Sequence, residues 1–378
     1  MGPAGVSGRV LVAPLYALVL AVAVTAPLFA PGYLLLRDAV STPRSYPTDA
    51  ALGLSEAAPR ALPQDFLLAV ASSVVDGGVV VKALLVAGLW LAGWGAARLS
   101  AVLLPDAGVG GQCVAATVAI WNPYVAERLL QGHWSLLVGY GCLPWVAAAM
   151  LRLRTAPGEG APFAALVFWI AAAGLTPTGL ILAAIVALVG VAVPGAGRPR
   201  RQCAAVALAA ATISALPWLT AAALAQTLSP SQAAGVVPFA ARAEPGLGTL
   251  LSLAGLGGIW NSEAVPASRT TTFAIVGTAV LLAIVVAGAT VALRRPAARP
   301  LLGLAAVAVA APALMATGPG LAALEALVTA LPGLGVLRDG QKWVALAMPG
   351  YAVAGAAATT LLRRVPGAAT ALACCAAL

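Results

Sequence analysis

Residues 10–33 read VLVAPLYALVLAVAVTAPLFAPGY, a stretch without a single charged side chain. About 20 apolar residues in an α-helix are enough to cross the hydrocarbon of a bilayer. The only basic residue ahead of this run is Arg9, and the run is longer than the apolar core of a secretory signal, which has roughly 7–15 residues. We therefore predict an uncleaved first transmembrane helix.

The rest of the chain has the same character. Of its 378 residues, 61% are hydrophobic and 9% are charged, whereas soluble domains carry about 25% charged residues. So few polar side chains cannot cover a soluble globule, and lipid must be the solvent for most of the chain. The formal net charge of +9 does not indicate nucleic-acid binding, because the basic residues do not cluster into a soluble domain.

Apolar windows of this kind recur along the chain. They lie at 10–33, 79–97, 108–121, 135–151, 162–175, 178–194, 203–224, 273–293, 301–317 and 344–362. An eleventh begins near residue 365 and is still apolar at Leu378, so we expect the last span to be truncated. The windows predict an all-α protein, a polytopic transmembrane helical bundle of about ten or eleven spans in a single domain over 1–378. The short windows on either side of Thr176-Pro177-Thr178 form either a re-entrant or a tightly turned pair.

Lys and Arg set the predicted orientation, because they are enriched in the short cytoplasmic loops of multi-pass proteins. With the N-terminus inside, 12 of the 21 fall at cytoplasmic ends: Arg9, Arg98, Arg152, Arg154, Arg198, Arg200, Arg201, Arg294, Arg295, Arg299, Arg363 and Arg364. Of the 12 acidic residues, only Asp106 and Glu159 fall inside. We therefore predict a multi-pass protein of the cytoplasmic membrane with a cytoplasmic N-terminus. Its long loops, 37–78, 225–272 and 318–343, lie outside.

The first candidate site opens the first long loop, where Arg37-Asp38 follows the first span. Long loops carry function more often than short ones, and a carboxylate beside the mouth of a helical bundle suits a general base. The alternative is an ordinary interfacial charge pair. Later in the same loop, residues 64–76 predict a short interfacial helix.

The second candidate is the compact loop 121–134, WNPYVAERLLQGHW. Arg128 and His133 carry donors for a phosphate or a sugar hydroxyl, and the aromatic side chains suit the face of a sugar. These are Trp121, Tyr124 and Trp134. The alternative is an aromatic belt with an interfacial cap, in which His133 is structural.

The third candidate is Arg338-Asp339-Gly340-Gln341-Lys342-Trp343. Its two cations, Arg338 and Lys342, suit a phosphate held at the membrane surface, and they depart from the predicted positive-inside pattern. The alternative is a helix start that Asp339 caps, with the cations meeting lipid headgroups. Lys82, about one turn inside the second span, either snorkels to the interface or joins this anion-binding set.

Other kinds of site lack their sequence signals. The cysteines, Cys113, Cys142, Cys203, Cys374 and Cys375, all lie in or beside apolar runs, without zinc-type spacing. We expect them to be small apolar fillers and predict no metal site. No Gly-rich nucleotide loop and no His-Glu-x-x-His motif is present, which argues against ATP-driven transport by this chain alone.

Taken together, these elements resemble the GT-C superfamily of membrane glycosyltransferases, and in particular its integral membrane proteins from mycobacteria and related actinobacteria. The resemblance rests on Arg37-Asp38 with the interfacial helix behind it, on the run 121–134 continuing into LLVGYGCLPW at 136–145, and on LRDGQKW at 337–343 before a late span. It covers the layout of most of the chain. Several relatives carry a paired acidic motif, whereas Asp38 has no acidic neighbour.

The resemblance implies a GT-C-like fold and an inverting transfer from a polyprenyl-phosphate sugar donor to a glycan or glycolipid acceptor of the cell envelope. It makes Asp38 the general base. It assigns Arg338 and Lys342 to the donor phosphate. The residues that would orient donor or acceptor are Arg128, His133, Tyr124 and Trp134. Arabinofuranose and mannose are the sugars it suggests, and a divalent cation stays an open requirement.

Two other functions fit the sequence. A transporter or flippase of lipid-linked intermediates would place ionisable groups near mid-bilayer, where this chain has almost none. A non-catalytic membrane scaffold would leave Asp38 far from the segment 338–342. The distance between these two parts of the chain therefore separates the transferase from the scaffold.

Overall fold

The computed structural model describes residues 3–55, 61–156, 162–224, 235–331, 334–361 and 367–378. Within these ranges, five helices are long and apolar enough to cross a membrane, and one bent pair would make a sixth span. The five are α1 (Pro3–Thr25), α4 (Gly77–Leu103), α7 (Trp134–Thr155), α10 (Arg200–Leu224) and α12 (Phe273–Ala292). The prediction of an all-α, multi-span membrane protein is confirmed.

The other apolar windows also hold helices, but shorter ones. They are α5 (Gly108–Ile120), α8 (Ala164–Ala173), α9 (Pro177–Gly190), α13 (Arg299–Met315), α15 (Met348–Ala358) and α16 (Gly367–Ala377). The bent pair joins α13 to α14 (Gly318–Ala330) at 90°, so a stretch predicted as loop is helical. Full-length spans are fewer than the ten or eleven windows, because hydropathy alone does not register where Gly and Pro interrupt a helix.

Short elements connect these helices. They are η1 (Ala26–Phe29), β1 (Leu35–Leu36), β2 (Ala39–Val40), α2 (Asp49–Leu52), α3 (Gln64–Ala71), η2 (Pro105–Ala107), α6 (Pro123–Gln131), α11 (Thr249–Ala254), η4 (Ser262–Ala264), η5 (Ala267–Thr270), η6 (Leu334–Leu337) and η7 (Gly340–Ala347). The predicted helix in the first long loop is α3. Arg363, Arg364, Glu56 and Glu159, which entered the predicted orientation, lie outside the described residues.

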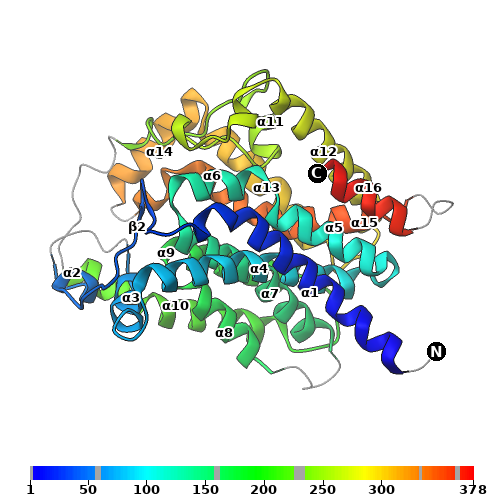
Figure 1. Cartoon of the computed structure of the whole chain (residues 1–378), viewed down its shortest axis with the longest axis horizontal. Helices are drawn as coiled ribbons and strands as arrows, with labels where there is room; N and C mark the ends of the chain where they lie inside the picture. Colours follow the sequence, from blue (N-terminus) through cyan, green and yellow to red (C-terminus); the bar gives the residue numbers. More distant parts are fainter. Residues whose placement is uncertain (1–2, 56–60, 157–161, 225–234, 332–333, 362–366) are drawn as a thin grey trace.

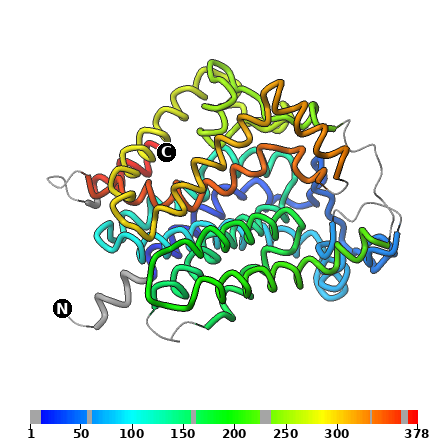
Figure 2. The backbone as a smooth tube through the Cα atoms, turned by 180° about the vertical axis from the view of Figure 1, so that it is seen from behind, coloured from blue at the N-terminus to red at the C-terminus, as the bar shows by residue number. Residues whose placement is uncertain are grey.

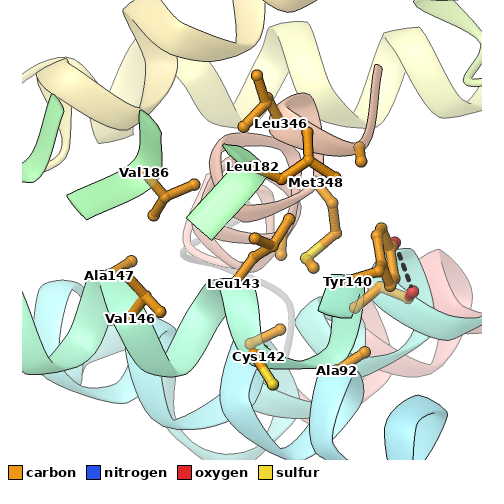
Figure 3. Close-up of a cluster of buried hydrophobic side chains, with 14 of the residues drawn as sticks. Ala92, Tyr140, Cys142, Leu143, Val146, Ala147, Leu182, Val186, Leu346 and Met348 are labelled. Carbon is orange, nitrogen blue, oxygen red and sulfur yellow. Dashed lines mark hydrogen bonds between the residues drawn. The ribbon is translucent and has the colours of Figure 1, made fainter. Parts of the chain in front are cut away.

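The centre of the bundle is built by α4, α5, α7 and α15. Small residues let the helices approach closely, as in other membrane bundles. A Cβ on Gly141 of α7 would lie 2.1 Å from the carbonyl oxygen of Gly88 in α4, and a Cβ on Gly288 of α12 would lie 1.8 Å from that of Ala354 in α15. Beside these contacts, apolar side chains from α7, α9, η7 and α15 form a buried cluster around Leu143 (Figure 3).

The arginine-bearing turns gather at the end of the bundle where α4 and α7 finish. These two helices run in the same direction, since Gly88 meets Gly141 and Gly95 meets Trp145. In the last turn of α7, Arg154 donates to the carbonyl oxygen of Val193. Just after α4, Asp106 pairs with Arg295 at 2.6 Å. In Figures 1 and 2, the N-terminus lies toward one side and the β2, α2 and α3 segment toward the opposite side.

Candidate functional site

Asp38 lies in the turn of a hairpin that follows the first span. β1 and β2 pair antiparallel and leave Arg37-Asp38 as a two-residue connection. Arg37 has a φ of +53°, and a positive φ is what the first position of a two-residue hairpin turn of type I′ or II′ needs. A non-glycine residue adopts it only at a cost, so the surroundings must hold the turn in place.

The C-terminal end of α6 holds it. The backbone N–H of Asp38 donates to the carbonyl oxygen of Gln131 at 3.1 Å, and Arg37 Nη1 donates to that of Leu130 at 2.6 Å. Gly132 ends α6 with a φ of +86°. A Cβ at this glycine would lie 2.3 Å from the backbone nitrogen of Ala39. The hairpin can therefore pack this closely against α6 only because residue 132 has no side chain.

α6 itself is short and turns polar residues inward. The side chain of Asn122 caps its first turn by accepting from the N–H of Val125 at 3.0 Å. Glu127, Arg128 and Gln131 are all buried. Since the flanking chain is so apolar, each of these groups needs a partner.

Arg128 finds its partners in the segment 339–341, more than two hundred residues away. Its Nη1 and Nη2 donate to the two carboxylate oxygens of Asp339 at 2.7 and 3.1 Å, and Nη2 also donates to Oε1 of Gln341. The arginine side chain is 0% exposed and that of Asp339 is 5% exposed. Such a bidentate pair is strong and fixes geometry. The alternative in which Asp339 caps a helix is wrong, because its side chain makes no capping hydrogen bond.

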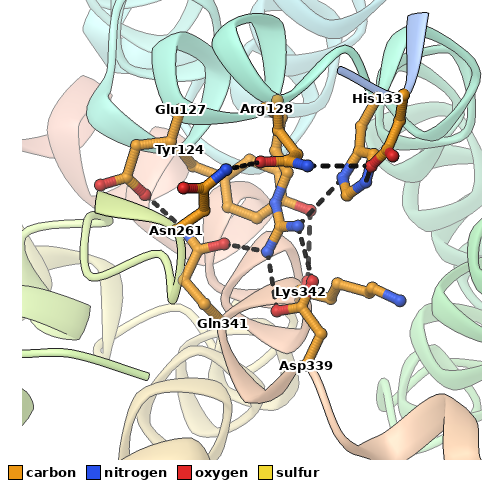
Figure 4. Close-up of polar contacts among 10 residues, drawn as sticks. Tyr124, Glu127, Arg128, His133, Asn261, Asp339, Gln341 and Lys342 are labelled. Atoms are coloured by element: carbon orange, nitrogen blue, oxygen red, sulfur yellow. Dashed lines mark hydrogen bonds and ion pairs between the residues drawn. The ribbon is translucent and has the colours of Figure 1, made fainter. Parts of the chain in front are cut away.

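Gln341 continues the network to a second buried carboxylate. Its Nε2 donates to Oε2 of Glu127 at 2.9 Å, whose Oε1 accepts from the N–H of Gly258 at 3.1 Å. Burial is the main reason that the pKa of Glu127 rises well above its ordinary value, and nearby Glu244 adds to the effect. Figure 4 shows these side chains converging between α6 and η7.

His133 joins this buried network to Asp38. Arg128 Nη1 lies 3.0 Å from Nδ1 of the ring, and Nε2 lies 2.8 Å from Oδ2 of Asp38. A guanidinium can only donate, so Nδ1 must accept. Nε2 therefore carries the proton and donates it to the carboxylate, which defines the tautomer by its neighbours.

The titration of the two groups follows from these contacts. Burial lowers the pKa of His133 more than its bond to Asp38 raises it, and the histidine stays neutral. The hydrogen bond from His133 lowers the pKa of Asp38, with further help from Gln131 and the charge of Lys342. Asp38 is thus ionised while 56% of its side chain is exposed. It is the part of the network that a solute can reach.

The two predicted phosphate-binding cations are placed differently. Lys342 is half-buried, and its charge acts on Asp38, His133 and Asp339. It helps Arg128 hold the pKa of Asp339 at about 2. The guanidinium of Arg338 instead lies over the ring of Phe239, 5.5 Å from its centroid. The structure thus brings Lys342 to Asp38, while Arg338 packs on an aromatic side chain.

Two of the three predicted stacking residues, Tyr124 and Trp134, are buried. Tyr124 is 1% exposed, stacks on Tyr140 at 5.4 Å and donates to the carbonyl oxygen of Lys342 at 3.2 Å. Trp134 belongs to the hydrophobic core. Tyr124 therefore packs against the network, with the guanidinium of Arg128 5.4 Å from its ring centroid, whereas Trp121 is exposed. Aromatic type alone could not separate the two situations.

Four further polar residues of the network, Glu127, Gln131, Asn261 and Gln341, were not predicted from the sequence. The available signal was their polarity within so apolar a chain, because buried polar groups must be matched by partners. In the described part of the chain, no three His, Cys, Asp or Glu side chains come together as metal ligands would. Comparisons with protein-family models, curated proteins and solved structures found no match.

Proposed function

We propose that this chain is a membrane glycosyltransferase of the GT-C type. It would transfer a sugar from a polyprenyl-phosphate donor to a hydroxyl of a cell-envelope glycan or glycolipid. The observation that carries the proposal is the exposed, ionised carboxylate of Asp38, held by His133 at 2.8 Å beside the charge of Lys342. A base and a cation next to each other at the end of an apolar bundle suit this reaction.

The step balances with the groups at hand. Asp38 takes the proton of the acceptor hydroxyl, whose oxygen forms the new bond to the anomeric carbon. The bond from that carbon to the phosphate oxygen breaks, and the electron pair leaves with the polyprenyl phosphate. Lys342 stabilises the developing negative charge, so the leaving group needs no proton. One direct displacement inverts the anomeric centre.

The remaining groups position the base. Arg128 and Asp339 orient His133, and His133 orients Asp38. In this proposal Arg338 meets the donor phosphate farther from the reacting carbon, and the apolar helices accommodate the polyprenyl tail.

We place the site on the non-cytoplasmic face of the cytoplasmic membrane. Lys and Arg mark cytoplasmic ends, and the turns that carry Arg154 and Arg295 lie at the end of the bundle away from Asp38. With the five native cysteines replaced by serine, Tyr46→Cys and Arg200→Cys, each labelled from outside in intact cells, test this. The proposal expects labelling of the first only, and labelling of the second alone would reverse it.

The decisive experiment uses the purified chain in nanodiscs with radiolabelled polyprenyl-phosphate arabinofuranose or mannose and a cell-envelope acceptor. Asp38→Asn should lower transfer at least about 100-fold, the size of a lost general base. Asp49→Asn is the matched control, since Asp49 is an exposed carboxylate at the start of α2. Assays with and without a chelator decide whether a divalent cation takes part. Undiminished transfer by Asp38→Asn would refute the proposal.

A further inference from the structure

A second feature lies beside Asp38: a polar segment between α11 and α12 that contacts the hairpin and the end of α6. Its residues Asn261 and Glu263 both contact the base or its neighbours. Arg37 Nη2 donates to the carbonyl oxygen of Glu263 at 2.8 Å and approaches its carboxylate at 3.5 Å. The strained residue of the turn is thus held from outside as well as from α6.

Asn261 reaches Asp38 through Gln131. Asn261 Nδ2 donates to Oε1 of Gln131 at 2.8 Å, and Nε2 of Gln131 donates to Oδ2 of Asp38 at 3.0 Å. One amide thus links the segment to the carboxylate.

A backbone N–H group sets the donor-to-acceptor direction of these hydrogen bonds. The N–H of Glu263 donates to Oδ1 of Asn261 at 3.1 Å, and a backbone N–H cannot accept. The amide of Asn261 must therefore present its NH2 to Gln131. Gln131 in turn must present its own NH2 to the carboxylate. In each of these three hydrogen bonds, the donor lies farther from Asp38 along this series of contacts than the acceptor.

We propose that the segment Asn261–Glu263 is a clasp, and that Asn261 is a positioning residue that forces the donor side of Gln131 onto the general base. This inference rests on the proposed function for its catalytic meaning, although the clasp is defined by contacts alone. The titratable groups that face Asp38 are the neutral His133 and the cationic Lys342, and Arg37 beside it is paired with Glu263.

The clasp makes an unusual prediction for two substitutions. Asn261→Asp keeps an acceptor for the N–H of Glu263, but its second oxygen can no longer donate. Gln131 must then turn its NH2 toward position 261 and its carbonyl oxygen toward Asp38. Asn261→Ala removes the cap and the contact, yet leaves Gln131 able to donate to Asp38. The near-isosteric change is therefore the more harmful one.

The readout is the chain's single histidine. With 15N-histidine in the full chain in nanodiscs, the signal of His133 Nε2 follows protonation of Asp38 without any substrate. Asn261→Asp should raise the midpoint of Asp38 protonation by about one pH unit, which corresponds to the loss of one hydrogen bond to a charged group. Asn261→Ala should raise this midpoint by less. In a Gln131→Leu background most of the Asn261→Asp shift should vanish, because the relaying amide is gone.

Two results would overturn the clasp: an equal or larger shift for Asn261→Ala, or a shift for Asn261→Asp that persists undiminished without Gln131. A merely structural role predicts the first of these. The proposed function is tested separately. If the wild-type chain transfers no sugar while the Asp38 titration midpoints of the variants keep the expected order, the proposed transferase function is refuted and the clasp still stands. If the wild-type chain does transfer sugar, the acidic limb of the pH profile of kcat/KM should shift in each variant by as much as the midpoint of Asp38 protonation.

Discussion

Arg128 Nη1 donates to Nδ1 of His133 across 3.0 Å, and this contact decides which ring nitrogen of the chain's single histidine carries a proton. A second proton on Nδ1 would face a buried cation that cannot accept a hydrogen bond. The ring is therefore a fixed donor toward Asp38. It transmits the rigidity of the buried Arg128–Asp339 pair to an exposed carboxylate.

The neutral histidine has a consequence for stability. Its folded pKa is lowered relative to about 6.5 in the unfolded chain. Below that pH the unfolded state binds a proton that the folded state does not, so this group's contribution declines as pH falls. The pKa of Glu127 is raised, which acts in the opposite sense. His133→Gln isolates the histidine, because glutamine can still accept from Arg128 and donate to Asp38.

We expect the thermal midpoint of the wild type, relative to that of His133→Gln, to drop between pH 7 and pH 5. Tryptophan fluorescence of the purified proteins in detergent measures it. A difference that is constant with pH would mean that His133 titrates equally in both states.

The buried ion pair predicts a non-additive pair of substitutions. Removing one partner of such a pair costs about 3–5 kcal/mol, because a charge is left in an apolar site, whereas replacing both costs far less. Arg128→Leu or Asp339→Leu alone should lower the thermal midpoint strongly, and the double variant should recover much of the loss. Sugar transfer should stay low in all three variants, because His133 loses either its hydrogen-bond donor Arg128 or the carboxylate of Asp339 that holds Arg128 in place. Simple addition of the two stability losses would contradict this account.

Substitution of Gly132 tests the packing of the hairpin, and Gly108 provides the matched control. Both have positive φ, +86° and +58°, so alanine at either costs about 1–2 kcal/mol in backbone strain. A Cβ at Gly132 would strike Ala39, while one at Gly108 would meet nothing within 4 Å. Gly132→Ala should therefore displace Asp38, lower transfer and alter the His133 signal, and Gly108→Ala should leave both as in the wild type. Equal effects would show that strain alone is responsible.

Lys342 and Lys82 are the two lysines of the chain, which makes one a control for the other. Lys82 donates to the carbonyl oxygens of Ala30 and Gly32. Lys342→Met should raise KM for the polyprenyl-phosphate donor about tenfold, equivalent to about 1.4 kcal/mol of a charge contact, and should lower kcat as the leaving group loses its cation. Lys82→Met, with the same change in net charge, should leave both constants near the wild-type values. An unchanged KM in Lys342→Met would take this lysine out of phosphate binding.

The broad architecture was accessible from the sequence alone. Uncharged runs such as 10–33 can be stable only in lipid, and their recurrence defined an all-α, multi-span protein. The same reasoning did not separate full-length spans from short helices such as α8 and α15, because hydropathy does not depend on where a helix begins or ends. It also treated α14 as a loop.

The site divided along a similar line. Four site residues, Asp38, Arg128, His133 and Lys342, could be predicted because polar side chains are rare in this chain. Only the tertiary structure decided that Arg128 is a buried support and Asp38 the accessible end, and that Gln131 and Asn261 relay between segments. Which groups are wet and which nitrogen holds a proton depend on partners more than a hundred residues apart. Such partners meet only when the chain folds, and for that reason composition and spacing cannot specify them.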